Sequence, residues 1–157
     1  MDLRYVLQGR VTMGDAAGMT DDFNGAKVAL FIGTELLVIL RDDDPDIAFP
    51  NMWDFPGGGR EGDETPFETL AREVKEEVGL TLPRHAIIWE KCLPWSQDAT
   101  QKIWFFVAQM PAGTEAKIVF GDEGQRWALM TPNAFMTLEK TVPNLGQRLR
   151  LWMDETT

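Results

Sequence analysis

The 157-residue sequence has few of the residues on which several classes of protein depend. A single cysteine, Cys92, cannot form an internal disulfide, which favours a reducing compartment. A single histidine, His85, excludes a site built from two histidines and argues against zinc bound by nitrogen and sulfur. Positive charge is scarce: 15 Lys and Arg residues against 25 Asp and Glu leave a net charge of -10. No basic stripe stands out, so we expect no duplex nucleic acid as a partner.

Long apolar runs are absent as well. No segment approaches the ~20 apolar residues that a membrane span needs, and Met1 to Arg4 lack the basic start of a signal peptide. We therefore expect a cytoplasmic protein without a membrane partner, either a monomer or a homodimer. Hydrophobic residues make up 44% and charged residues 25% of the chain, values typical of a globular protein. At this length the sequence predicts one domain over residues 1–157.

Alternating apolar patterns and turn residues divide the chain into short elements. The predicted strands cover residues 3–9, 26–31, 36–40, 86–93, 102–110 and 124–130. The predicted helices cover residues 65–78 and 143–153, with a short one opening at Thr131-Pro132. A loop over 11–25 and a hairpin turn over 33–35 separate the first three strands. Strands interleaved with helices in this order predict an α/β protein with a mixed sheet and helices on its faces.

The predicted helix at 65–78 has well-defined ends. Thr65 and Glu68 have the spacing of a capping box, Pro66 stands at the first helical position, and Gly79 follows the last. One apolar arc predicts the buried face, and it consists of Phe67, Leu70, Ala71, Val74 and Val78. Upstream of the helix, three glycines at 57–59 permit a close approach of the backbone to a ligand.

Three glutamates lie beside that apolar arc: Glu73, Glu76 and Glu77. At ~100° per residue they span roughly 100° of the helix and point the same way. Like charges at this spacing destabilise an isolated helix. A solvated acidic face is one interpretation. The other is a site for hard divalent cations, because oxygen ligands suit these ions and a bound cation would relieve the repulsion. With the glycine segment alongside, the spacing favours metal-ion hydrolysis.

These residues also resemble a known family. Gly58, Glu64, Arg72-Glu73-Val74, Glu76-Glu77 and Gly79-Leu80 fill every fixed position of the Nudix box, G-x5-E-x7-R-E-U-x-E-E-x-G-U. The resemblance implies a Nudix-type α/β/α sandwich with a mixed β-sheet. It also implies an enzyme that uses water and Mg²⁺, or Mn²⁺ as a substitute, to cleave a nucleoside diphosphate linked to another group.

The same resemblance implies roles for residues of the box. It implies metal binding by three carboxylates, one of them serving through a water or as the base: Glu73, Glu76 and Glu77. The backbone carbonyl of Gly58 would be a further ligand. Arg72 would pair with Glu64 and hold the glycine loop against the helix.

The flanks of the box resemble MutT-type nucleoside triphosphate pyrophosphohydrolases. Arg41 falls where that group has a nucleotide-contacting arginine. Trp53 and Phe55 belong to a segment that resembles the one whose aromatic residue contacts the base. Glu123 matches a further catalytic or metal-binding glutamate, and Asn144 matches the asparagine that reads the base.

Each of these flanking residues also has a structural interpretation. Arg41 would pair with the aspartates that follow it, and Phe55 would lie in the core. Asn144 would cap the last helix, and Glu123 would lie on a surface loop. Most of the six tryptophans have core spacing, but two lie close to loops and are candidate pocket walls: Trp53 and Trp95.

The favoured function is therefore a Mg²⁺-dependent pyrophosphohydrolase that converts a nucleoside triphosphate, canonical or oxidised, into nucleoside monophosphate and pyrophosphate. The alternative substrate is ADP-ribose or a nucleotide sugar. Dinucleoside polyphosphate hydrolases usually carry a tyrosine shortly after the box, whereas the only tyrosine here is Tyr5. A Nudix module that binds a nucleotide without cleaving it is the alternative of another class, although such modules usually lose box carboxylates. RNA decapping would need a basic channel, which the net charge of -10 argues against.

Overall fold

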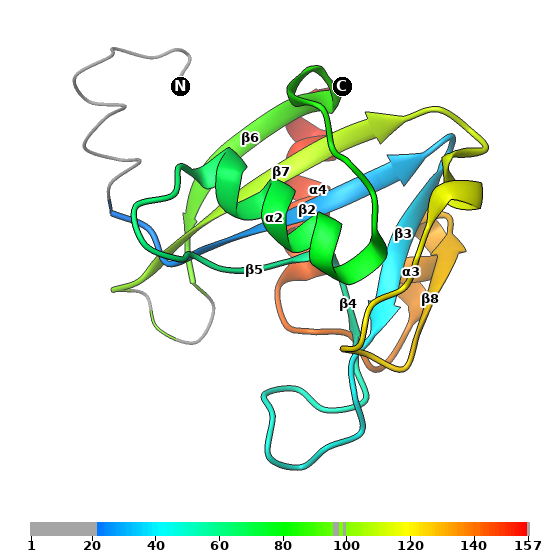
Figure 1. Ribbon diagram of the computed structural model, residues 1–157, viewed down its shortest axis with the longest axis horizontal. Helices are drawn as coiled ribbons and strands as arrows, with labels where there is room; N and C mark the ends of the chain where they lie inside the picture. Colours follow the sequence, from blue (N-terminus) through cyan, green and yellow to red (C-terminus); the bar gives the residue numbers. More distant parts are fainter. Residues whose placement is uncertain (1–21, 96–97, 99, 157) are drawn as a thin grey trace.

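The computed structural model describes residues 22–95, 98 and 100–156 (Figure 1). The predicted strand at 3–9 and most of the predicted loop at 11–25 lie outside these residues. Within the described part, no helix combines the length and the apolar character that crossing a membrane requires.

One mixed β-sheet forms the centre of the fold. Its main path runs in the order β4-β3-β2-β7-β6, and the bounds of these strands are β2 Gly25–Ile32, β3 Glu35–Leu40, β4 Trp53–Asp54, β6 Ile87–Pro94 and β7 Lys102–Met110. Two more strands pair off this path: β5 (Gly57–Gly59) with β2, and β8 (Arg126–Met130) with β3. β2 and β7 run parallel, and the other pairs are antiparallel. The predicted mixed sheet is confirmed.

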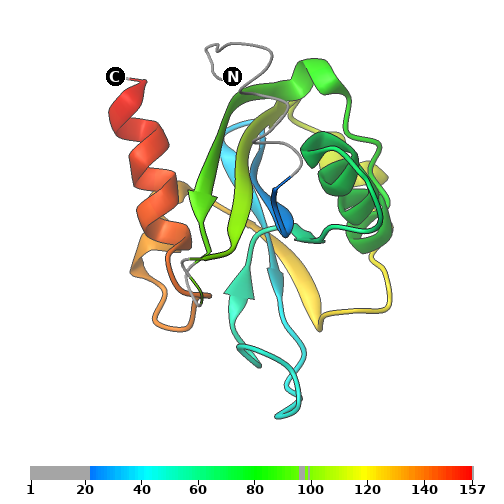
Figure 2. The same cartoon turned by 90° about the vertical axis from the view of Figure 1, so that its left-hand side faces the viewer.

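Helices cover both faces of the sheet, as Figure 2 shows edge-on. α2 (Pro66–Val78) packs on one face, and α4 (Leu145–Glu155) packs on the other with the short α3 (Pro132–Thr137). Successive residues of β2 point to opposite faces, so Val28 belongs to the core under α2 and Ala29 to the core under α4. The predicted α/β/α sandwich is confirmed. Two short 3-10 turns complete the described elements: Arg84–Ala86 and Thr114–Lys117.

The glycine segment is a strand rather than the predicted loop. Gly57–Gly59 pairs antiparallel with the start of β2, which places Gly59 opposite Gly25. This pairing needs small residues, because a Cβ on Gly25 would lie 2.7 Å from the carbonyl oxygen of Gly58. The pairing also moves the start of β2 back to Gly25, one residue before the predicted strand.

Two predicted elements begin later than expected because a residue with positive φ precedes each of them. The last helix starts at Leu145 instead of 143, since Asn144 has a left-handed conformation with φ 72°. The strand predicted from 124 starts at Arg126, after Gly124 at φ 94°. The two-residue strand β4 was not predicted at all, because two residues carry no periodic signal.

Candidate metal and nucleotide site

Local capping fixes where α2 begins and ends. The Thr65 hydroxyl accepts a hydrogen bond from the Glu68 backbone N–H at 3.2 Å, and the Glu68 carboxylate accepts one from the Thr65 backbone N–H at 2.9 Å. Gly79 ends the helix in the left-handed conformation with φ 71°. The predicted capping box and stop are therefore confirmed. They set the direction in which the three glutamates of the helix project.

Arg72 ties the glycine strand to this helix. Its Nε donates to Glu64 Oε2 at 2.7 Å, and its Nη2 donates to the Gly59 carbonyl at 2.8 Å. Its Nη1 donates to Glu73 Oε2 at 2.9 Å. The hydrogen bond from Arg72 lowers the pKa of Glu64 to about 2, so Glu64 is a fixed anion at neutral pH. The contact between Arg72 and Glu64 that the Nudix box implies is present.

Five carboxylates line one cavity of about 190 Å³, which we call the carboxylate cavity: Glu73, Glu76, Glu77, Asp122 and Glu123. The loop that supplies the last two is held against the end of α2, because the Gly121 N–H donates to the Glu77 carbonyl at 2.9 Å. Glu123 therefore lies beside the glutamates of the box. Sequence reasoning assigned no role to Asp122, the neighbour of Glu123.

Burial changes the protonation of two of these glutamates. It raises the pKa of Glu77 to about 8, against the opposing effects of the Lys27 charge and of a hydrogen bond from the Gly57 N–H. Burial also raises the pKa of Glu73, and Arg72 opposes that shift. Because burial disfavours the charged form of these carboxylates, a bound cation would stabilise that charged form.

The donors in this cavity fit a hard divalent cation by their chemistry, since all five are carboxylates. Among residues 22–95, 98 and 100–156, no three His, Cys, Asp or Glu side chains already converge on a single point. The hydrogen bonds present explain this arrangement. Arg72 Nη1 contacts Glu73 at 2.9 Å and Glu76 at 3.3 Å, and Glu77 accepts from Gly57 N–H at 3.0 Å. Metal binding would exchange these hydrogen bonds for ligation.

The carbonyl of Gly58 does not point toward the carboxylates, which corrects the ligand that the resemblance implies. Hydrogen bonds join Arg60 N–H to Asn24 O and Val28 N–H to Pro56 O, both at 2.9 Å. Antiparallel pairing alternates between bonded and non-bonded pairs, so the pair between them, Ala26 with Gly58, is also a bonded one. The Gly58 carbonyl is therefore used by β2.

The backbone at Gly58 also lies close to a side chain of α2. A Cβ on Gly58 would lie 2.5 Å from Glu73 Cδ, so the strand backbone packs directly against that carboxylate. The neighbouring glycines turn polar groups toward α2 instead: the Gly57 N–H donates to Glu77, and the Gly59 carbonyl accepts from Arg72. By the same alternation, Gly57 is the candidate for a backbone ligand.

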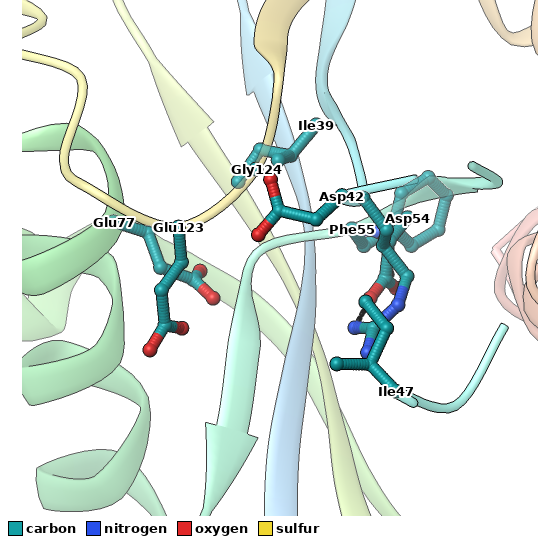
Figure 3. Close-up of a pocket in the computed structure, with 9 residues that line it drawn as sticks. Ile39, Asp42, Ile47, Asp54, Phe55, Glu77, Glu123 and Gly124 are labelled. Carbon is teal, nitrogen blue, oxygen red and sulfur yellow. Dashed lines mark hydrogen bonds and ion pairs between the residues drawn. The ribbon is translucent and has the colours of Figure 1, made fainter. Parts of the chain in front are cut away.

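A second cavity of about 250 Å³ adjoins the glutamates, and we call it the arginine cavity. Its lining includes Arg41, Asp54, Glu77 and Glu123. Figure 3 shows Glu77 and Glu123 on one side of it and Asp54 on the other. Arg41 Nη1 contacts Asp54 Oδ2 at 3.1 Å rather than the aspartates that follow Arg41, which was the alternative interpretation.

Asp54 forms ion pairs with two cationic side chains, Lys27 and Arg41. It is 4% exposed and accepts from Lys27 Nζ at 2.8 Å, from Arg41 Nη1 at 3.1 Å and from the Phe55 N–H at 2.8 Å. Sequence reasoning missed both Lys27 and Asp54. A signal was available for Asp54, which stands inside the segment that resembles the MutT type.

A third cavity of about 320 Å³ lies on the other side of this ion pair, and we call it the aromatic cavity. Lys27 lines it, whereas its partner Asp54 lines the arginine cavity. Two aromatic side chains also line it, Phe49 and Trp95. Its remaining walls include the backbone of β5, the apolar residues Ile103, Val142 and Leu145, and the cationic Arg148. Trp95 is thus a pocket wall, as one interpretation of its position predicted.

The other flanking residues lie differently. Phe55 is 1% exposed and its ring packs on Phe135 at 4.8 Å between centroids, and it also lines the arginine cavity. Trp53 lines none of the three cavities described above; Arg126 stacks over its ring at 5.2 Å. Asn144 occupies the N-cap of α4 without a side-chain capping hydrogen bond, and its two neighbours line the aromatic cavity.

Comparison with known proteins decides the family. The family model described as the NUDIX domain matches residues 24–152. This chain belongs to the Nudix family. It is 35% identical over 91 residues to an 8-oxo-dGTP diphosphatase of Escherichia coli, a match that covers 58% of this chain and 65% of that protein. It is 53% identical over 94 residues to an RNA pyrophosphohydrolase of Marinomonas, covering 58% of this chain and 53% of that protein.

The Nudix chain thus spans about half to two-thirds of the curated relatives that it matches. Solved structures agree on the fold. A MutT protein from Methanosarcina mazei superposes with a TM-score of 0.68 at 18% identity, over 87% of this chain and 97% of that one. An Ap4A hydrolase from C. elegans superposes with a TM-score of 0.64 at 18% identity, over 83% and 96% of the two chains. At this identity the likeness concerns the fold alone.

Proposed function

We propose that this Nudix protein is a divalent-metal-dependent pyrophosphohydrolase that converts a nucleoside triphosphate into nucleoside monophosphate and pyrophosphate. The observation that carries the proposal is the adjacency of three cavities of different character. Five carboxylates line the first, Arg41 lines the second, and aromatic residues line the third. Metal ions, phosphates and a nucleobase need environments of these three kinds close to one another.

Glu73, Glu76, Glu77 and Glu123 would hold Mg²⁺, with Mn²⁺ as a substitute, and the carbonyl of Gly57 would be the backbone ligand. The bound ion supplies charge neutralisation on the diphosphate bridge and activation of water. Arg41 and Lys27 would exchange part of their contact with Asp54 for phosphate oxygens. Arg72 positions the glutamates through its contacts with Glu73 and Gly59.

Glu77→Gln tests the metal site. We expect turnover to fall at least about a hundredfold, because the amide is a weaker ligand and cannot accept a proton. Glu139→Gln is the matched control, since Glu139 is exposed and lies in none of the cavities. Circular dichroism should report the same fold for both variants. Full activity of the Glu77→Gln variant would mean that Glu77 is not part of the metal site.

A product assay with Mg²⁺ tests the substrate. The panel holds canonical and oxidised nucleoside triphosphates, ADP-ribose, a nucleotide sugar and a dinucleoside polyphosphate, with Glu77→Gln as the blank. Pyrophosphate and monophosphate from a triphosphate would support the proposal. If AMP and a sugar phosphate form instead, the substrate belongs to the ADP-ribose class and not to the nucleoside triphosphates. Absence of turnover on the whole panel, with nucleotide binding retained, would favour a module that binds without cleaving.

RNA with a 5′-triphosphate is a second candidate, favoured by the name of the Marinomonas relative. The net charge of -10 disfavours it, because a polyanion is repelled without a basic surface. Competition separates the two: a short 5′-triphosphorylated RNA that inhibits hydrolysis of the free nucleotide at lower concentration than the nucleotide's own KM would favour RNA.

A further inference from the structure

Arg148 is a buried cation in the aromatic cavity. It lies on α4 and is 8% exposed, and it is the one Lys or Arg among the buried residues of the described chain. Its Nη2 donates to the Pro94 carbonyl at 2.7 Å. No carboxylate of the described residues lies within ion-pair distance of it. Burying a guanidinium in this way is costly unless its donors find partners.

The guanidinium of Arg148 has donors to spare. A guanidinium carries five N–H groups, and the protein provides the Pro94 carbonyl as acceptor within the described residues. In this part of the chain, the fully buried side-chain nitrogens and oxygens that lack a hydrogen-bond partner do not include any nitrogen of Arg148. Its remaining N–H groups are therefore accessible from the cavity that it lines. Burial also lowers the pKa of Arg148, with no acidic neighbour to oppose the shift.

The rest of the cavity is suited to a flat aromatic ligand. Phe49 and Trp95 offer ring surfaces, and Ile103 and Leu145 offer apolar contacts. Lys27 is the other cation in the lining, but its Nζ already contacts Asp54 at 2.8 Å and the Phe55 carbonyl at 3.2 Å. The side-chain amides of Asn24 and Gln101 also line the cavity, but Arg148 is the cation of the lining that has no carboxylate partner among the described residues.

We propose that Arg148 selects the base of the substrate by donating two hydrogen bonds to the O6 and N7 atoms of guanine. This inference rests on the proposed function and narrows its substrate to guanine nucleotides. A guanidinium fits these two adjacent acceptors as a fork, whereas adenine presents an amino group in place of O6. In 8-oxoguanine N7 carries a proton, so one of the two acceptors is lost. Arg148 therefore favours unoxidised guanine over both.

Variants on one helix test the inference. We expect the wild type to favour dGTP over dATP and over 8-oxo-dGTP in kcat/KM by about tenfold. Arg148→Met should reduce both ratios to about threefold or less, through a higher KM for dGTP and little change in kcat. Arg148→Lys, which keeps the charge but not the fork, should give intermediate ratios. Arg150→Met is the matched control, because Arg150 is exposed on the same helix.

A purely structural role through Pro94 would lower kcat/KM for all three nucleotides alike, and that result would overturn the inference. Unchanged ratios in Arg148→Met would overturn it too. Equilibrium binding of GMP and AMP without metal gives a second readout that does not require turnover. If no triphosphate is hydrolysed but the preference for GMP disappears in Arg148→Lys, the proposed reaction fails while the role of Arg148 stands. If triphosphates are hydrolysed and the ratios of kcat/KM do not depend on Arg148, the proposed reaction stands while the role of Arg148 fails.

Discussion

Arg72 and Glu64 form an ion pair in which Nε donates to Oε2 at 2.7 Å. The same guanidinium contacts the Gly59 carbonyl and Glu73, so one side chain joins the glycine strand, the loop after it and the helix of the site. Glu64 also accepts a hydrogen bond from the Thr69 hydroxyl at 2.9 Å. This pair therefore helps to position the carboxylates of the box.

Loss of the Glu64 charge should destabilise the fold in a pH-dependent way. We expect Glu64→Gln to lower the free energy of unfolding by about 1–3 kcal/mol at pH 7. Because Arg72 lowers the folded pKa of Glu64 from 4.5 to about 2, its contribution is full above pH 4.5 and is lost as the pH falls toward 2. Urea unfolding at several pH values measures the difference. Glu61→Gln is the control, since Glu61 is 69% exposed and contacts Arg72 at 3.4 Å. An equal effect of both variants would contradict the prediction.

Gly58→Ala should disturb the metal site from the strand side. The new Cβ would lie 2.5 Å from Glu73 Cδ, so the carboxylate must move away. We expect Mg²⁺ affinity and turnover to fall by about tenfold or more. Gly59→Ala is the matched control, because the nearest atom to a Cβ there is 3.9 Å away. Titration calorimetry of both variants with Mg²⁺ gives the comparison, and identical affinities would refute the close contact with Glu73.

Metal binding should strengthen as the pH rises. Burial raises the pKa of Glu77 from 4.5 to about 8, so without metal the folded protein keeps a proton that the unfolded chain loses. The stability from this group is therefore full below pH 4.5 and declines as the pH rises to 8. A cation must displace that proton, which predicts up to about a tenfold gain in Mg²⁺ affinity per pH unit between 6 and 8. Calorimetry in two buffers of different ionisation enthalpy counts the released proton. An affinity independent of pH would show that Glu77 is not a ligand.

Cys92 should react slowly in the folded protein. Burial raises the pKa of its thiol to about 11, so the thiolate is scarce at pH 8. We expect alkylation by iodoacetamide to be at least about tenfold slower than in the urea-unfolded chain, and to accelerate between pH 9 and 11. Mass spectrometry over time follows the reaction, with Cys92→Ser as the blank. Equal rates in folded and unfolded protein would mean that the thiol is exposed.

Features that depend on neighbouring residues could be predicted from the sequence. The ends of α2 follow from Thr65, Glu68 and Gly79, which act within one turn of the helix. The three glutamates of the box share one side of that helix because a helix repeats every 3.6 residues. The α/β/α sandwich and its mixed sheet follow from the order of apolar patterns.

Features that depend on pairing between distant segments were decided by the tertiary structure. Gly57–Gly59 became a strand because β2 pairs with it, and that register turned the Gly58 carbonyl away from the carboxylates. Asp122 joined them because the loop before β8 returns to the end of α2. No local pattern marked Arg148, since its neighbour Pro94 lies 54 positions away in the chain.

The division has a physical reason. Helix caps and side-chain periodicity arise from hydrogen bonds and geometry within a few residues, so the sequence by itself determined helix α2 and the family resemblance. Strand register and the burial of single polar side chains arise from contacts across the whole core. Only the tertiary structure could therefore decide which backbone oxygen faces the carboxylates. It also decided that the Arg148 side chain lines the aromatic cavity.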